Sequence, residues 1–146
     1  MIQENKDLLL KDLCARLPYK PIVQIDGCGI WNLLGIEHDD SAELRDRVIV
    51  WHGKNYPSSK NSYPIINCKP YLFPLSSMTE EQEDEWYDVF IDPLSKKLDR
   101  HTRQEYLQFQ TYAQAFGIEY LLKNHFDYQG LIERGLAIDA TNLNVY

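Results

Sequence analysis

The residues whose types and spacing come nearest to a reactive site lie near the end of the chain, in the segment NHFDYQGLIERGLAID at positions 124–139. A histidine two residues before an aspartate could act as a general base that the carboxylate orients, or both side chains could bind a metal. A metal site needs at least three protein ligands, however, and this pair supplies only two. The sequence also lacks a G-x-S-x-G motif, and no cysteine lies nearby to act as a nucleophile. A small hydrolase that uses His125, Asp127 and Tyr128 is therefore the alternative and not the preferred interpretation.

The same segment has the features of a helix end followed by a turn. Lys123 and His125 suit the negative C-terminal pole of a helix, Asn124 tolerates a left-handed cap, and Gly130 lets the chain turn away. The residues that would then pack back on the core are Phe126, Tyr128, Leu131, Ile132, Leu136 and Ile138. We prefer this structural interpretation, and we assign no catalytic residue, no metal ligand and no cofactor.

The length and composition of the chain indicate one globular domain, residues 1–146. Hydrophobic residues make up 44% of the chain and charged residues 25%, which is typical of a folded protein. The net charge of -7 disfavours general attraction to nucleic acid or to an anionic lipid surface. Three cysteines without a C-x-x-C pair, no signal peptide and no apolar run long enough to span a bilayer favour a cytoplasmic protein without a membrane partner.

The order of the secondary-structure signals predicts an α+β fold. Apolar residues at helical spacing predict an N-terminal helix over residues 4–17, which Pro18 ends. The next segments predict two strands, PIVQID and IWNLLGI, joined by a hairpin at Gly27 and Gly29. Two more predicted strands follow, RVIVWH and SYPIIN. SYPIIN is expected at the edge of the sheet because Pro64 lacks an N–H. Strands at short spacing within residues 20–67 favour an antiparallel meander of three or four strands.

Two C-terminal helices should follow this meander, and an extended C-terminal tail should pack on the core. Thr79 and Gln82 have the capping-box spacing, so a helix is expected from there to about Ile91, after a proline-punctuated connection at KPYLFPLSSMTEEQ. Thr102 and Glu105 repeat the signature before a longer helix. The apolar stripe of that longer helix is predicted at Tyr106, Phe109, Ala113, Phe116 and Tyr120.

The charges are unevenly distributed along the chain. No acidic residue occurs in residues 47–79, which contain basic and aromatic residues, whereas residues 80–92 contain seven acidic residues and no basic one. The aromatic, acid-free stretch 47–79 could bind single-stranded nucleic acid weakly, although its few bases make this the least favoured hypothesis. The acidic helix could dock a basic partner, or the two segments could simply neutralise one another within the fold.

The acidic helix also contains a candidate anchor for a partner. Consecutive helical residues are about 100° apart, so Trp86, Tyr87, Val89, Phe90 and Ile91 cannot all face inward. If Tyr87, Phe90 and Ile91 form the buried stripe, Trp86 lies at its edge among carboxylates. The proposed protein-binding residues are Glu81, Glu85, Trp86 and Asp88. The alternative is that Trp86 belongs to the core and that the acidic residues form its solvated rim.

Three blocks of the sequence carry a resemblance to a known family. The segments LLLKDLCARLPY (8–19), KPYLFPLSSMTEEQ (69–82) and NHFDYQGLIERGLAIDA (124–140) resemble a family of short uncharacterised bacterial proteins, often encoded among phage and mobile-element genes. The resemblance implies a cytoplasmic, non-essential accessory role, and it implies no activity, cofactor or catalytic residue. Together these observations predict a non-enzymatic accessory protein that binds a protein partner, and they leave self-association open.

Overall fold

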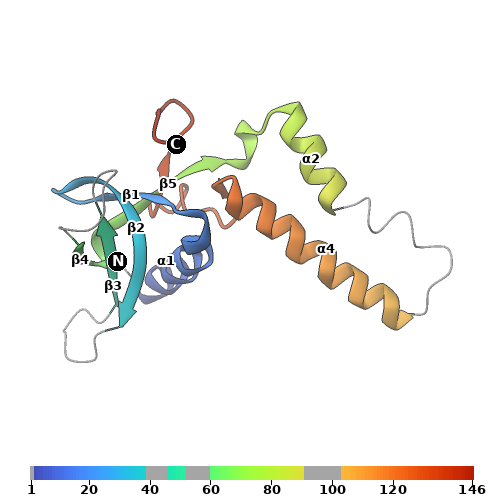
Figure 1. The fold of residues 1–146 in the computed structure, drawn as a ribbon, viewed down its shortest axis with the longest axis horizontal. Coiled ribbons are helices and arrows are strands. Elements are labelled where there is room, and N and C mark those ends of the chain that lie inside the picture. The colour runs from blue at the N-terminus through green and yellow to red at the C-terminus, as the bar shows by residue number, and fades with distance from the viewer. Residues whose placement is uncertain (1, 39–45, 52–59, 91–102) are drawn as a thin grey trace.

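The antiparallel half of the sheet is built from four consecutive strands (Figure 1). The structure is a computed structural model, and it describes residues 2–38, 46–51, 60–90 and 103–146. Strands β1 (Ile22–Ile25), β2 (Gly29–His38), β3 (Asp46–Trp51) and β4 (Lys60–Pro64) each pair antiparallel with the next. The predicted meander is thus present, with β4 as the predicted edge strand.

The hairpin between β1 and β2 depends on two glycines. Gly27 has a φ of 72° and Gly29 a φ of 94°, a region of backbone conformation that residues with a Cβ rarely adopt. These angles close the turn so that Ile25 lies opposite Gly29 in the register. The prediction of a hairpin at these two glycines is confirmed.

The other half of the sheet corrects the predicted fold. Strand β5 (Cys68–Pro74) falls in the segment for which a proline-punctuated connection was predicted. It pairs antiparallel with β1 and parallel with two short C-terminal strands, β6 (Phe126–Asp127) and β7 (Ile138–Asp139). Within the described residues the sheet therefore has seven strands and is mixed, whereas a purely antiparallel meander of three or four strands was predicted.

The position of Pro70 explains why a strand tolerates a proline here. Pro70 pairs with Val23 of β1, but the described pairing of β5 with β6 and β7 begins only at Tyr71. The missing N–H of the proline therefore interrupts no bond on the side of the parallel strands. The local sequence reads as a loop because the strands that complete β5 lie more than fifty residues further along the chain.

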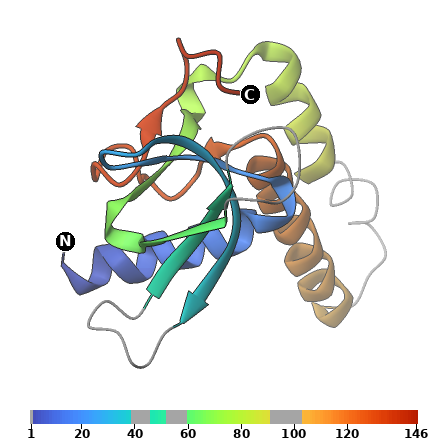
Figure 2. The same cartoon turned by 60° about the vertical axis from the view of Figure 1, so that its left-hand side comes forward.

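Helix α1 (Gln3–Arg16) covers one face of the sheet, as Figure 2 shows. Leu9 and Leu13 are fully buried against apolar side chains of β1, β2 and β3. A second cluster, formed by Leu72, Leu131, Leu136 and Ala137, lies where β5 meets the C-terminal segment. The predicted N-terminal helix and the packing of the C-terminal residues on the core are confirmed.

Helices α2 (Glu80–Phe90) and α4 (Arg103–Lys123) pack against one another and extend away from the antiparallel strands (Figure 1). The predicted capping box is present at the start of α2. The Thr79 N–H donates to Gln82 Oε1 at 3.0 Å, and the Gln82 N–H donates to Thr79 Oγ1 at 3.2 Å. Thr102, predicted to cap the second helix, lies outside the described residues.

Several details of the helical part differ from the prediction. Three 3-10 turns, η1 (Leu17–Tyr19), η2 (Ile65–Asn67) and η3 (Leu75–Ser77), were not predicted. The predicted stripe of α4 is also partly wrong, because Phe116 is 40% exposed. In the described part of α4 the buried residues are Ala113, Gly117, Leu121 and Leu122, so the inward face is rotated from the aromatic stripe. The side chains of Tyr106 and Phe109 lie outside the described part.

Candidate functional site

The acidic surface of the molecule lies on α2. The sequence of this helix, EEQEDEWYDVF, contains six carboxylates and no basic residue. The six side chains are exposed, and they belong to Glu80, Glu81, Glu83, Asp84, Glu85 and Asp88. The half-buried residues among positions 80–88 are Gln82 and Trp86, which are four positions apart and therefore share one face of the helix.

This arrangement corrects the predicted orientation of the helix. One of the two predicted arrangements placed Tyr87 in the buried stripe with Trp86 at its edge, but Tyr87 is 56% exposed and Trp86 is half-buried. The inward face follows Gln82 and Trp86 because α2 packs on α4, which places Trp86 beside Leu121. The side chains of Val89, Phe90 and Ile91 lie outside the described part of the chain.

An apolar hollow lies beside Trp86, and we call it the Trp86 hollow. It has a volume of about 370 Å³. Its lining residues are Leu75, Met78, Glu83, Trp86, Tyr87 and Leu121, from η3, α2 and α4. Leu75 is 44% exposed, so apolar surface at the hollow is open to a partner. An indole that is neither fully buried nor fully exposed, with apolar side chains around it, has the character of an interface anchor.

The predicted protein-binding residues differ in their hydrogen bonding. Glu81 and Asp88 are exposed without a hydrogen bond among the described residues, whereas Glu85 Oε2 accepts a hydrogen bond of 2.9 Å from the Tyr120 hydroxyl of α4. Burial, together with this bond, raises the pKa of Tyr120 to about 12. Glu85 therefore contributes to the contact between α2 and α4.

The structure separates the roles of His125, Asp127 and Tyr128. Asp127 is 7% exposed, and its two carboxylate oxygens accept hydrogen bonds from the backbone N–H groups of Leu131, at 2.9 Å, and Ile132, at 2.8 Å. The carboxylate thus closes the turn that follows β6 and makes no hydrogen bond to His125. No hydrogen bond joins the Tyr128 side chain to either residue, and its hydroxyl accepts a hydrogen bond from Gln129 Nε2 at 3.0 Å. The predicted helix end and turn are confirmed.

His125 occupies an unusual position at this helix end. It is the residue with left-handed backbone geometry, with a φ of 58°, whereas Asn124 was predicted to take that conformation. Its ring stacks on the ring of Tyr146, with centroids 4.0 Å apart and planes inclined by 14°. Burial, and to a smaller extent the nearby Arg16, lowers the pKa of His125 to about 4, so its imidazole is neutral at pH 7.

A buried ion pair beneath this segment was not predicted. Arg16 and Asp12 are fully buried, with Arg16 Nε 2.7 Å from Asp12 Oδ2. Arg16 Nη2 also donates to the carbonyl of Phe126 at 2.8 Å, and Gln129 Nε2 donates to Asp12 Oδ1 at 3.1 Å. The pair therefore ties α1 to β6 and to the turn after it. The only signal in the sequence is the spacing of four residues between Asp12 and Arg16 on the helix face that also carries Leu9 and Leu13.

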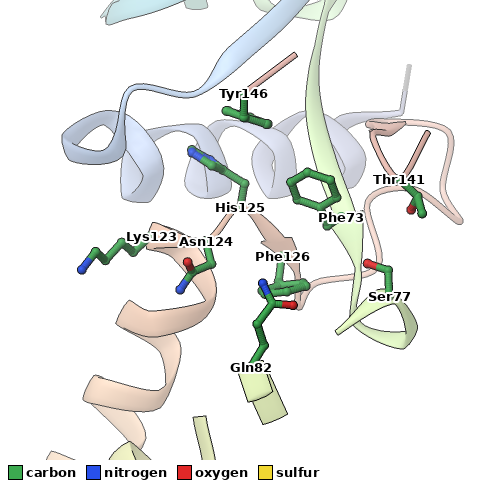
Figure 3. A pocket seen from close by; sticks show the side chains of 9 residues that line it. All are labelled: Phe73, Ser77, Gln82, Lys123, Asn124, His125, Phe126, Thr141 and Tyr146. Carbon is green, nitrogen blue, oxygen red and sulfur yellow. The ribbon is translucent and has the colours of Figure 1, made fainter. Parts of the chain in front are cut away.

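A second hollow, which we call the His125 hollow, was also not predicted (Figure 3). Its volume is about 370 Å³, and segments from β5 to the last residue contribute to it. Its lining residues are Phe73, Ser77, Gln82, Lys123, Asn124, His125, Phe126, Thr141 and Tyr146. Gln82 of α2 reaches the hollow from one helix, and Asn124 reaches it from the end of another.

The aromatic, acid-free stretch 47–79 supplies part of the core. Tyr71 is 5% exposed, and its hydroxyl donates to Gln24 Oε1 at 2.9 Å. Phe73 packs on Phe126, with ring centroids 6.3 Å apart. Tyr71 is therefore not presented on an open surface as a base-stacking platform would be, and Phe73 is half-buried. The side chains of Trp51 and Tyr56 lie outside the described part.

Comparison of the chain with protein-family models, with curated proteins and with solved structures finds no match. In the parts of the chain that the structure describes, no group of three or more His, Cys, Asp or Glu side chains is placed to hold a metal ion. No helix among the same residues has the length and apolar character needed to cross a bilayer.

Proposed function

We propose that this chain is a non-enzymatic protein-binding module, and that α2 with the Trp86 hollow is its binding surface. The occupant that fits is a basic amphipathic helix of a partner protein. Its apolar residues enter the hollow, and its lysines or arginines face the carboxylates of α2. The single observation that carries the proposal is an apolar hollow on a helix with six exposed carboxylates and no basic residue.

The charges of α2 support a basic partner. Six carboxylates within eleven residues create a strong negative field, and nothing in the helix itself neutralises it. Such a field steers a positively charged partner to the surface and rejects acidic ones. Because exposed charges are screened by salt, binding of this kind should weaken as the ionic strength rises.

The apolar side chains supply the contact that charges alone cannot. Aromatic residues dominate the energetics of protein interfaces when they become fully desolvated on binding. Tyr87 and Leu75 are both largely exposed at the hollow, and Trp86 forms part of its wall. A helix inserts apolar side chains at spacings of three and four residues, which suits a hollow bounded by two helices.

The proposal can be tested by selecting peptides from a random library of helical 16-mers for binding to the complete chain. The comparison variant is the triple substitution Glu81→Lys, Asp84→Lys and Asp88→Lys, which spares Glu85 because Glu85 holds Tyr120. We expect the selected peptides to be basic and amphipathic. Their affinity should fall at least about tenfold on the triple variant, since loss of about 0.5 kcal/mol per charge is joined by new repulsion.

Two controls separate docking from folding. The variant Tyr87→Ala removes an exposed anchor and should weaken the same peptides without changing the unfolding midpoint. Glu133→Gln, at an exposed position in the turn after β6, should change neither. Selected peptides without a basic bias, or peptides that bind the triple variant as tightly as the unmodified chain, would contradict the proposal.

A further inference from the structure

The His125 hollow has walls that suit a flat molecule. Phe73 is half-buried and Tyr146 is 45% exposed, and both line the hollow, with ring centroids 5.9 Å apart and planes inclined by 45°. His125 lines it as well, with its ring held against Tyr146. Aromatic faces of this kind stack on planar heterocycles, and each stacked base contributes substantially to binding in proteins that use them.

The two amide side chains of the hollow have defined orientations. Gln82 Oε1 accepts from the Thr79 N–H, so this atom must be the oxygen, and Nε2 is a donor that makes no hydrogen bond to a described residue. Asn124 Nδ2 donates to the Tyr120 carbonyl at 3.0 Å, so its Oδ1 is the remaining acceptor. Figure 3 shows both side chains at the hollow. The hollow therefore offers one amide donor and one amide acceptor to a molecule inside it.

His125, which lines the hollow, has a ring nitrogen whose hydrogen-bonding capacity is unused within the described part of the chain. Its Nδ1 atom is buried and has no hydrogen-bond partner among the described residues. Buried polar atoms in folded proteins are nearly always hydrogen-bonded, because leaving one unsatisfied is costly. The same residue is held in the left-handed backbone region, where side chains other than glycine are uncommon and often mark a functional position.

The charges around the hollow favour a neutral molecule. Among its nine lining residues Lys123 is the single charged side chain, and no carboxylate lines the hollow to balance a cation. A multiply charged anion is disfavoured by the net charge of -7 and by the neighbouring acidic helix. The volume of about 370 Å³ lies at the small end of the range for ligand sites.

We propose that the His125 hollow binds the base of a neutral nucleoside, stacked against the aromatic walls. Nucleobases carry donors and acceptors side by side on one edge, and Asn and Gln amides are the side chains that read such edges. The Gln82 Nε2 donor would meet a ring nitrogen or carbonyl of the base, and the Asn124 Oδ1 acceptor would meet an amino or imino N–H. This site does not depend on the proposed protein-binding surface.

The test is titration of the complete chain with adenosine, guanosine, cytidine and uridine. Isothermal titration calorimetry measures the affinity, and NMR measures the chemical-shift changes of the lining residues. The informative variant is Gln82→Glu. A glutamate oxygen can still accept from the Thr79 N–H and keep the capping box. It replaces the Nε2 donor by a second acceptor, so we expect at least about a tenfold loss of affinity with an unchanged unfolding midpoint.

Matched variants identify the source of any binding. Lys123→Met distinguishes a neutral ligand from an anionic one, because loss of binding in this variant would show that the ligand depends on the ammonium group and would overturn the neutral nucleoside. Glu81→Gln, outside the hollow, should leave the affinity unchanged within about twofold. The proposal is overturned if no nucleoside at 5 mM (a concentration about at the weak limit of specific binding) shifts the lining residues, or if Gln82→Glu binds as well as the unmodified chain.

Discussion

The buried pair of Asp12 and Arg16 allows the strictest test of how this fold is held together. Neutralising the carboxylate with Asp12→Asn keeps the shape of the side chain but leaves the Arg16 guanidinium, which is fully buried, without its counter-charge. Removal of one partner of a buried pair typically costs about 3–5 kcal/mol, because the remaining charge is poorly solvated. The hydrogen bond from Gln129 to Asp12 would be weakened at the same time.

Urea denaturation followed by circular dichroism measures this cost as a shift of the midpoint at constant slope. The control is Glu4→Gln, because Glu4 lies 3.9 Å from Arg134 in a largely exposed pair and should contribute less than about 1 kcal/mol. A double variant that combines Asp12→Leu with Arg16→Met removes both charges of the pair together. This double variant should therefore be more stable than Asp12→Asn alone, although the Phe126 carbonyl loses a donor. If Asp12→Asn costs no more than Glu4→Gln, the pair does not hold α1 to the C-terminal segment as argued.

Two further predictions concern His125. The variant His125→Gly should be more stable than His125→Ala by about 1 kcal/mol in urea denaturation. Both variants lose the stacking on Tyr146, but only glycine adopts a φ of 58° without strain. Equal stabilities would show that the backbone is not strained. The pKa of His125 is about 4 in the folded chain, whereas an unfolded chain keeps the ordinary imidazole pKa of about 6.5, so the unfolded state binds the proton first as the pH falls. The free energy of unfolding should therefore decrease between pH 6.5 and pH 4 relative to that of His125→Gln, and a pH-independent difference between the two proteins would refute the assigned burial.

The parts of the fold that the sequence predicted are those determined by neighbouring residues. The hairpin follows from Gly27 and Gly29, and the start of α2 follows from the reciprocal bonds of Thr79 and Gln82. Helix α1 follows from apolar spacing along a single segment. Each of these signals acts over a few residues, so the physical interaction that stabilises the element is visible in the sequence itself.

Strand β5 could not be predicted in this way, because its stability comes from distant partners. The prolines at positions 70 and 74 argue against a strand locally, and the burial that favours one comes from β1 and from the C-terminal segment. The inward face of α2 was missed for a related reason. Hydrophobicity alone ranks Trp86 and Tyr87 alike, and only the packing of α2 on α4 decides that Trp86 turns inward and Tyr87 outward.

The same distinction explains the two hollows. All but one of the residues that line the Trp86 hollow lie between positions 75 and 87, so the acidic and aromatic composition of one helix is enough to indicate this region. The His125 hollow draws on residues from Phe73 to Tyr146. These residues meet because β6 and β7 both lie parallel to β5, a pairing that places the end of α4 and the last residues beside η3. Its amide groups are ordinary capping and helix-end residues in the sequence. These residues come to line one hollow only when that parallel pairing has formed. Gln82→Glu keeps the capping bond with Thr79 and removes the Nε2 donor, so it separates the structural role of the residue from a role in binding.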